Sequence, residues 1–282
     1  MRILYVTDLH GIKWKFERIV DRCAAGWSKD VDLLIVGADI LPKNQQNVHK
    51  QQFGFLTKYL PRFFDSIQQP IIIDFGNDDH KALYKTFRDL IDMRCDGSVY
   101  YSHMRSFKIN GVTFAGMHYV PDYPFRIKDW VRADHSEDDH YDMDTFQYGE
   151  PILSTKDGYE KIANFQSYLD SHTSLNTALS TLGIPDVLLA HSPPRMLGLD
   201  VCSDMREVGS RAITEYILKN APKLTLHGHI HESHYMTGTD MGSLTEGSIS
   251  IQPGQNGISQ LTYCEFDLDD IAGTYIRQIR NR

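Results

Sequence analysis

Residues 2–10, RILYVTDLH, join a short apolar, β-rich run to a turn that carries Asp8 and His10. A stripe of apolar residues with helical spacing follows, from Phe16 to Trp27. A second apolar run, 31–36, ends in Gly-Ala-Asp, and a third, 70–75, ends in Gly-Asn-Asp-Asp, with another helical stripe between these two runs. Strands that alternate with helices in this way predict parallel pairing and an α/β fold.

The second helical stripe contains Pro61, which either kinks the helix or starts a new one. From 99 to 116 the pattern changes to short alternating strands, and Asn110-Gly111 is a hairpin signal. We therefore expect the sheet to turn antiparallel there. A largely helical stretch is expected from about 158 to 182.

Further strands are expected at 187–190 and 224–227, with a helix at about 210–219 between them. Residues 120 to 151 form a long irregular segment with an acidic tract at 134–144, which is expected to be a solvated loop or a lid over a pocket. Neither a repeat nor a break in composition is visible. We expect a single domain over residues 1–282.

The composition excludes several classes of protein. The 282 residues carry a net charge of −8, which lacks the basic excess of a protein that coats nucleic acid. The four cysteines are far apart and contain no C-x-x-C, so neither a disulfide framework nor a thiolate zinc site is indicated. No leader and no apolar run of membrane-spanning length is visible. We expect a reduced, cytoplasmic protein that is not embedded in a membrane.

Carboxylate, amide and imidazole side chains follow the apolar runs at the points where strands would end. In open α/β sheets, ligands bind beyond the carboxyl ends of the strands, so side chains far apart in sequence can converge there. Oxygen and nitrogen donors without sulfur suit Mn²⁺, Fe, Zn²⁺ or Co²⁺ and select none of them. Each motif alone is weak, but five strand-end matches in one chain are a strong signal. The candidate metal ligands are Asp8, His10, Asp39, Asn77, His191, His229 and His231.

The order D-x-H, G-x-D, G-N-x-D, H, G-H-x-H resembles that of the calcineurin-like metallophosphoesterases, from Met1 to about Gly254. Three further segments are similar to that family: HSPP at 191–194, LHGHIHES at 226–233 and Gln252-Pro253-Gly254. The resemblance implies two stacked mixed β-sheets flanked by helices, and a dinuclear metal centre. One metal would be held by Asp8, His10, Asp39 and His231, and the other by Asp39, Asn77, His191 and His229.

Two cations about 3.5–4 Å apart can clamp a phosphoryl oxygen, lower the pKa of a shared water to give hydroxide near neutral pH, and offset transition-state charge. A carboxylate that bridges them, as the resemblance implies for Asp39, fixes their separation. Glycines precede Asp39, Asn77 and His229, where they permit a sharp turn and keep side-chain bulk away from the substrate.

Two nearby histidines have competing interpretations. His227 shares strand parity with His229 and His231, but the resemblance excludes it as a ligand and favours a core or supporting role. His118, followed by Tyr119 and by an aromatic segment up to Phe125, could supply an acid and an aromatic pocket wall; a plain hydrophobic loop is equally consistent with the pattern.

Asp78 departs from the family pattern, which has a histidine there that protonates the leaving group. A carboxyl beside two cations is ionised at neutral pH and is a poor proton donor. Family members with this histidine replaced resemble phosphodiesterases or, in the retromer subunit of this fold, a protein-binding scaffold. Asp78 or Asp79 could instead cap a helix that begins near His80.

We therefore predict a metal-dependent phosphoester hydrolase that prefers diesters, with Asp78 and His118 as candidate catalytic residues. A metal-retaining scaffold with little or no turnover is the alternative. A TIM-barrel hydrolase would need eight β/α repeats, which the antiparallel middle of the chain does not supply. The expected partners are two divalent metal ions, for which manganese is a candidate, and a phosphoester substrate, for which a nucleotide is one candidate.

Overall fold

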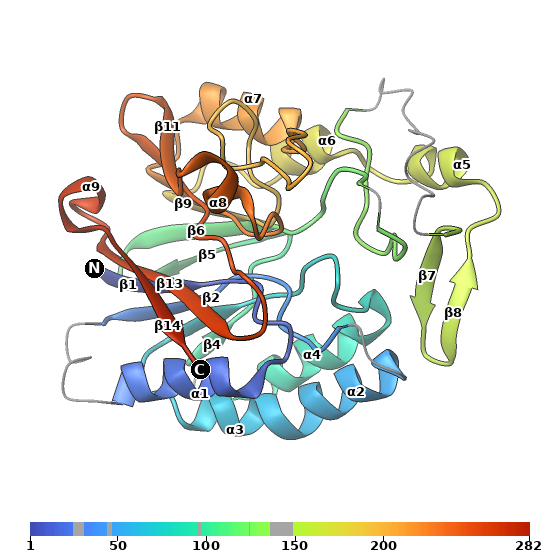
Figure 1. Ribbon diagram of the computed structural model, residues 1–282, viewed down its shortest axis with the longest axis horizontal. Helices are drawn as coiled ribbons and strands as arrows, with labels where there is room; N and C mark the ends of the chain where they lie inside the picture. The colour runs from blue at the N-terminus through green and yellow to red at the C-terminus, as the bar shows by residue number, and fades with distance from the viewer. Residues whose placement is uncertain (25–30, 44–46, 95–96, 124, 136–148) are drawn as a thin grey trace.

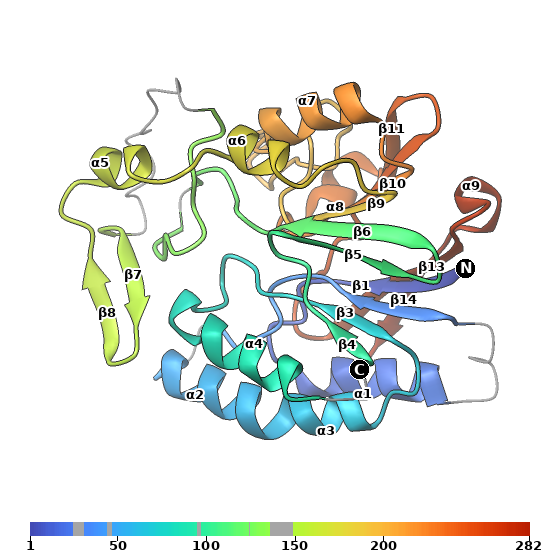
Figure 2. The same cartoon turned by 180° about the vertical axis from the view of Figure 1, so that it is seen from behind.

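The computed structural model describes residues 1–24, 31–43, 47–94, 97–123, 125–135 and 149–282. Two six-stranded mixed sheets face each other, and helices cover their outer faces (Figures 1 and 2). This architecture confirms the predicted α/β fold class. The first sheet contains, in spatial order, β14 (Ile276–Asn281), β13 (Gln260–Asp267), β1 (Arg2–Val6), β2 (Leu33–Val36), β3 (Ile71–Ile73) and β4 (Val99–Tyr100).

The second sheet contains, in spatial order, β11 (Met241–Thr245), β12 (Ser248–Ile251), β10 (Leu224–Leu226), β9 (Val187–Ala190), β6 (Val112–Met117) and β5 (Arg105–Ile109). The first sheet contains a run of four neighbouring parallel strands, β1, β2, β3 and β4. In the second sheet, β6, β9, β10 and β12 form a similar run. Because parallel strands end at the same edge, each sheet presents a row of strand carboxyl ends.

Alternating side chains of each central strand enter two different cores. In β1, Leu4 and Val6 pack against the helices, whereas Ile3 and Tyr5 pack between the two sheets. Strands buried on both faces explain why the sequence shows continuous apolar runs. The helices beside the first sheet are α1 (Lys13–Ala24), α2 (Val48–Gly54), α3 (Leu60–Asp65) and α4 (Tyr84–Asp92), and those that pack on the second sheet are α6 (Leu175–Ser180) and α7 (Arg211–Asn220).

The segment that contains Pro61 remains helical throughout. A π-helical turn, Phe55–Tyr59, follows α2, and the α-helix α3 then begins with Pro61 in its first turn. The first turn of a helix does not use its backbone N–H groups, so proline is tolerated there. Gly54 and Tyr59, at the two junctions, keep right-handed helical angles, so α3 continues the helical run through the π-helical turn and does not start after a break.

The region from 99 to 116 is antiparallel only in part. β4 pairs in parallel with β3, whereas β5 and β6 form an antiparallel hairpin. Asn110 and Gly111 both have positive φ, as a type I′ hairpin turn requires. The expectation of a general antiparallel turn was therefore wrong for β4, and the hairpin prediction was confirmed.

The prediction of a largely helical stretch from about 158 to 182 is also wrong for its first residues. β7 (Ile152–Thr155) and β8 (Gly158–Lys161) form an antiparallel hairpin, and α5 (Phe165–Asp170) and α6 come after it. Lys156 and Asp157 form the turn, and Gly158, the first residue of β8, has a φ of 139°. An Asp-Gly pair is a hairpin signal, which the longer helical pattern concealed. The remaining short helices are a 3₁₀ turn at Lys81–Leu83, α8 (Ser233–Thr237) and α9 (Ile271–Thr274).

The irregular segment at 120–151 makes isolated bridges, between Val120 and Val131 and between Ile127 and Ile152. Most of the acidic tract, residues 136–144, lies outside the described residues. Its first residue, Asp134, is not a solvated charge, because its carboxylate accepts hydrogen bonds from the Ser210 hydroxyl and the Arg211 amide at the start of α7. In the described part of the chain, no helix has both the length and the apolar character needed to cross a membrane.

Candidate metal centre

All seven candidate ligands follow the carboxyl ends of strands. Asp8 and His10 follow β1, Asp39 follows β2, and Asn77 follows β3. On the second sheet, His191 comes directly after β9, and His229 and His231 follow β10. Contacts between these side chains join residues from both sheets.

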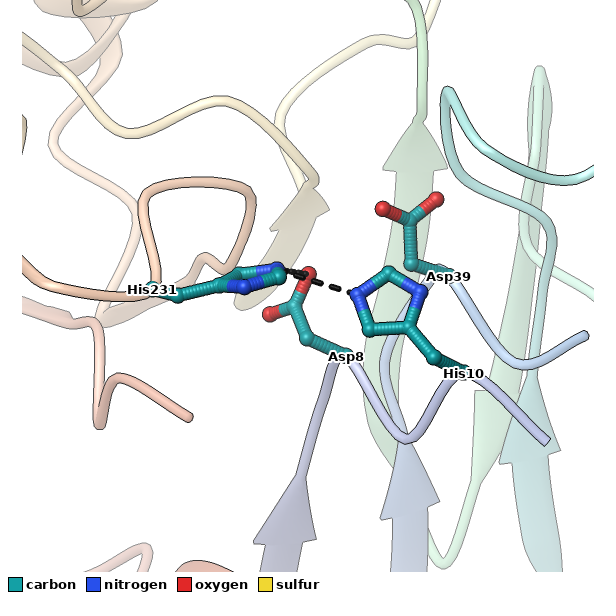
Figure 3. Close-up of side chains that lie close together, drawn as sticks. All are labelled: Asp8, His10, Asp39 and His231. Carbon is teal, nitrogen blue, oxygen red and sulfur yellow. Dashed lines mark hydrogen bonds and ion pairs between the residues drawn. The ribbon is translucent and has the colours of Figure 1, made fainter. Parts of the chain in front are cut away.

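Four of these side chains form one compact group. One ligand atom from each of Asp8, His10, Asp39 and His231 lies within 4.8 Å of the others. Figure 3 shows Asp8, His10 and His231 turned toward one another, with the Asp39 carboxylate above the His10 ring. His231 Nε2 is 3.0 Å from His10 Nε2 and 3.4 Å from Asp8 Oδ1. These residues include two carboxylates and two imidazoles, a donor set suited to a divalent transition metal.

The other three ligands meet beside this group. Asn77 Oδ1 lies 2.9 Å from His191 Nε2 and 2.6 Å from His229 Nδ1. His191 Nε2 also lies 3.4 Å from Asp39 Oδ2, and the His229 amide donates to Asp8 Oδ1 at 3.2 Å. The structure thus brings all seven predicted ligands together, with Asp39 in contact with both groups.

The backbone at the site is strained. Four of the seven ligands, namely Asp8, His10, Asp39 and His229, have φ between 46° and 68°. Non-glycine residues adopt this left-handed conformation infrequently, and such residues concentrate at functional sites. The strain therefore singles out the same turns as the sequence motifs do.

Two glycines are required by close approach of a carboxylate. A Cβ at Gly76 would lie 2.3 Å from Asp39 Oδ1, and a Cβ at Gly228 would lie 2.4 Å from Asp8 Oδ2. Neither glycine has a positive φ. The glycines of the G-N and G-H motifs thus make room for the carboxylates of neighbouring strands.

Burial and neighbouring charges set the protonation of the ligands. Burial alone would raise the pKa of Asp8, but the imidazoles of His231, His191 and His10 outweigh it and lower that pKa. Burial lowers the pKa of His10 and brings that of His229 to about 3. The pKa of His191 is raised, because Asp39 and Asp8 outweigh the effect of burial. The carboxylate of Asp8 and the neutral imidazoles of His10 and His229 are therefore available as ligands at neutral pH.

Unsatisfied polar atoms indicate that the residues fit a metal. Asp8 Oδ2 and His191 Nδ1 are buried and have no hydrogen-bond partner among the described residues. The Nε2 atoms of His10 and His231 face each other. When both rings are neutral and in the same tautomer, both atoms carry a hydrogen or both lack one, so no hydrogen bond forms between them. A cation would satisfy these electron pairs, since buried polar atoms normally have a partner.

Asp79 supports the site from behind. Its buried carboxylate accepts hydrogen bonds from the amides of Ile40, Leu41 and Gly76, and so connects the turns after β2 and β3. Burial, together with repulsion from Asp39, raises the pKa of Asp79 well above its usual value. The hypothesis that it caps the following helix is wrong.

The amides at the start of that helical segment have partners from distant segments. Lys81 N donates to Asp129 Oδ2, and Ala82 N donates to Ser154 Oγ. Asp78 does not cap the segment either. Its Oδ2 forms an ion pair with Lys43, its Oδ1 accepts from Asn77 Nδ2 at 3.3 Å, and its amide donates to Asp39 Oδ1 at 2.8 Å. Asp78 therefore lies directly beside two of the ligands.

His227 lies in the core. Its Nδ1 contacts the carbonyl oxygens of Ala190 and Ser192, and its Nε2 contacts Thr225 Oγ1 at 2.7 Å. Burial lowers its pKa to about 4. These contacts correspond to the core or supporting role that the sequence analysis favoured.

His118 is buried with a separate polar group. Its Nε2 lies 2.9 Å from Ser102 Oγ and 3.4 Å from Asp74 Oδ2, and its amide donates to His103 Nδ1. Asp74 also accepts from the amides of Ser102 and His103. In the aromatic segment, the Phe125 ring packs edge-on against His229, with ring centroids 5.8 Å apart.

Facing mixed sheets with a buried carboxylate, amide and imidazole cluster at their strand ends define an α/β metal-binding protein with the donor set of a metallohydrolase. The family model of the calcineurin-like phosphoesterases matches residues 1–233. The chain belongs to that family. No curated protein matches the sequence.

Solved structures share the fold at low sequence identity. TT1561 of Thermus thermophilus is 13% identical with a TM-score of 0.54, over 99% of this chain and 98% of that one. The phosphopantetheinyl hydrolase of Mycobacterium tuberculosis is 12% identical with a TM-score of 0.51, over 90% and 89%. A dimetal phosphatase of Danio rerio is 9% identical with a TM-score of 0.50, over 100% and 96%.

Proposed function

We propose that this protein is a dinuclear, metal-dependent phosphoester hydrolase that prefers diesters. The observation that supports the proposal best is the position of Asp39. This carboxylate belongs to the compact group with Asp8, His10 and His231, and its Oδ2 also lies 3.4 Å from His191 in the second group. One carboxylate shared by two sets of ligands is the arrangement that two neighbouring cations require.

The residues divide into two sets. Asp8, His10, His231 and Asp39 would hold one ion, and Asn77, His191, His229 and Asp39 would hold the other. When bound, such ions neutralise phosphoryl charge and increase the acidity of a water molecule. The Asp79 carboxylate joins the turns that carry the ligands after β2 and β3, and the half-buried Phe125 ring packs edge-on against His229. Manganese is one candidate metal, because the mixed oxygen and nitrogen set suits it as well as Fe, Zn²⁺ and Co²⁺.

Asp78 supports a preference for diesters. A phosphomonoester dianion is repelled by a neighbouring carboxylate more strongly than a diester monoanion is. Two unit charges about 4 Å apart interact by about 4 kcal/mol at an effective dielectric constant of 20. Lys43 offsets part of this repulsion, and a residual difference of about 1.4 kcal/mol would still give a tenfold preference.

Two further points complete the proposal. His118 stays a second candidate acid on the sequence pattern alone, because its described contacts are to Ser102, Asp74 and His103 and not to the seven predicted ligands. A cytoplasmic location belongs to the proposal, because four cysteines without a C-x-x-C spacing do not indicate a disulfide framework. Nucleotide-derived diesters are the first natural substrates to test.

A paired substrate assay tests the proposal. Metal-stripped protein is reloaded with Mn²⁺, Fe²⁺, Co²⁺ or Zn²⁺ and assayed with bis(4-nitrophenyl) phosphate and 4-nitrophenyl phosphate. We expect metal-dependent hydrolysis with the larger kcat/KM for the diester. Two bound ions without hydrolysis of any ester above the metal-free blank would favour the scaffold alternative and contradict the proposal.

A further inference from the structure

A cavity of about 330 Å³ opens beside the metal centre. Three predicted ligands, Asp8, His10 and His231, form one wall. The other walls include two lysines, Lys15 from α1 and Lys43 from the loop after β2. A volume of this size is large enough for a small substituent of a bound ligand. The cavity therefore continues the candidate site on the side of the first ligand group.

Lys15 is a buried cation whose two hydrogen-bond partners are both neutral. Lys15 is 1% exposed to solvent, and its Nζ donates to Gln255 Oε1 at 3.1 Å and to the Gly257 carbonyl at 2.9 Å. No carboxylate of the described residues forms an ion pair with it. An ammonium group has three donors, so these two neutral acceptors leave one donor unused. Burial lowers the pKa of Lys15 to about 8, and the attraction of the Asp8 carboxylate offsets only part of this effect.

Lys43 supplies a second positive charge at the same cavity. Its Nζ lies 2.9 Å from Asp78 Oδ2, so Asp78 holds the ammonium in place beside the ligand group. Asp8 is the acidic residue in the cavity lining, and the proposed metal would neutralise its charge. With metal bound, the balance of charge along the cavity becomes positive, which favours an anion.

We propose that this cavity binds a second anionic group of the substrate, a phosphate or a carboxylate attached close to the scissile phosphoryl group, and that Lys15 and Lys43 are its binding residues. The inference rests on the proposed function, and it narrows the substrate class to phosphoesters with two separate anionic groups. A purely structural role for Lys15, as a link between α1 and residues 255–257, would need only a neutral donor.

Three non-hydrolysable phosphonates of similar length provide the test. 3-Phosphonopropionate carries a carboxylate where propylphosphonate has a methyl group and 3-aminopropylphosphonate has a methylene that bears an ammonium group. Their dissociation constants are measured by isothermal titration calorimetry on the manganese-loaded protein. We expect 3-phosphonopropionate to bind about tenfold more tightly than propylphosphonate, and the aminopropyl compound to bind most weakly.

Variants assign the preference to the lysines. Lys15→Met and Lys43→Met should each reduce the preference for 3-phosphonopropionate over propylphosphonate at least threefold. Lys219 is exposed, and Lys219→Met should leave this preference unchanged. If Lys15→Met does not fold, the partly exposed Lys43 still tests the cavity. A wild-type protein without preference for the carboxylate, or a preference that persists in both variants, overturns the inference.

The outcome is separable from that of the proposed function. A protein that hydrolyses bis(4-nitrophenyl) phosphate but binds all three phosphonates equally keeps the proposed function and loses this inference. A protein that hydrolyses no ester but shows the lysine-dependent preference keeps the anion site and loses the proposed turnover. Failure to bind any of the three compounds overturns the anion site.

Discussion

Lys43 Nζ lies 2.9 Å from Asp78 Oδ2, and the same carboxylate oxygen lies 3.8 Å from His10 Nδ1. The carboxylate that replaces the family's histidine is therefore half of an ion pair. Burial would lower the pKa of Lys43, but the nearby carboxylates of Asp78, Asp39 and Asp8 outweigh it and raise that pKa. The Lys43 ammonium is therefore charged at neutral pH beside the Asp78 carboxylate, so the effect of Asp78 on a substrate depends on Lys43.

The first prediction separates the two charges of this pair. Lys43→Met leaves Asp78 uncompensated and should raise the diester-to-monoester ratio of kcat/KM by roughly tenfold, or about 1.4 kcal/mol. Asp78→Asn should lower the ratio, and Asp78→His should lower it further because it also restores a proton donor. The ratio is measured at equal metal occupancy. If none of the three variants changes the ratio, Asp78 does not govern discrimination by substrate charge.

The second prediction concerns the shared carboxylate. Asp39→Asn should lower the occupancy of both metal ions, because Asp39 contacts both ligand groups, while the retained amide oxygen can still accept from Asp78 N. Elemental analysis after gel filtration measures the occupancy. The control is Asp200→Asn. Asp200 is also a buried carboxylate, but it accepts a hydrogen bond from the Gly209 amide, so this variant should keep the wild-type metal content. A single tightly bound ion, equal in wild type and Asp39→Asn, would contradict the dinuclear proposal.

The third prediction distinguishes three neighbouring histidines. His229→Ala and His231→Ala should each lose metal and activity, because each side chain contacts other predicted ligands. His227→Ala removes contacts to Thr225 and to the carbonyls after β9, so it should reduce the free energy of unfolding by about 1–3 kcal/mol and keep both ions. Urea unfolding and elemental analysis report the two effects. Loss of metal in a folded His227→Ala protein would show that the ligand assignment is wrong.

The sequence could predict the seven clustered residues because each follows an apolar run, and parallel pairing places the strand ends together. It could not predict Lys15 and Lys43 as neighbours, since one lies in a helix and the other in a loop, and neither belongs to a motif. Asp79 was noticed, but its role was misjudged because its partners, Ile40 and Leu41, follow a different strand. Contacts between segments that no periodicity relates depend on the tertiary fold, not on local pattern.

The fourth prediction uses a glycine at the site. Gly228→Ala would place a Cβ 2.4 Å from Asp8 Oδ2 and from Thr7 Oγ1, so one of these side chains must move. We expect about 1–3 kcal/mol of destabilisation and weaker metal binding. Gly54, in α2, has no atom within 4 Å of its Cβ position and no positive φ. Gly54→Ala should therefore be neutral or stabilising by up to about 1 kcal/mol. Equal metal affinity in wild type and Gly228→Ala would show that Asp8 does not need this space.

The last prediction concerns acid stability and His103, which lies away from the ligands. Burial lowers its pKa to about 3, and its Nδ1 accepts a hydrogen bond from the His118 amide, which only the unprotonated nitrogen can do. Aromatic rings of Tyr84, Tyr119 and Trp130 surround it edge-on. The folded state therefore resists protonation of this imidazole.

The unfolded chain has no such resistance and takes up a proton on this imidazole below its ordinary pKa of about 6.5. Between about pH 6.5 and 3 the unfolded state binds more protons than the folded state does, so the free energy of unfolding falls as the pH falls. At pH 5 the loss due to His103 is about 2 kcal/mol relative to pH 8. His103→Asn keeps an acceptor for the His118 amide but does not titrate. Urea unfolding of the metal-free protein at pH 8 and pH 5 should show a pH-dependent loss smaller by about 2 kcal/mol in His103→Asn than in wild type, whatever the variant costs at pH 8. An identical loss in both proteins would mean that His103 is not held neutral in the folded state.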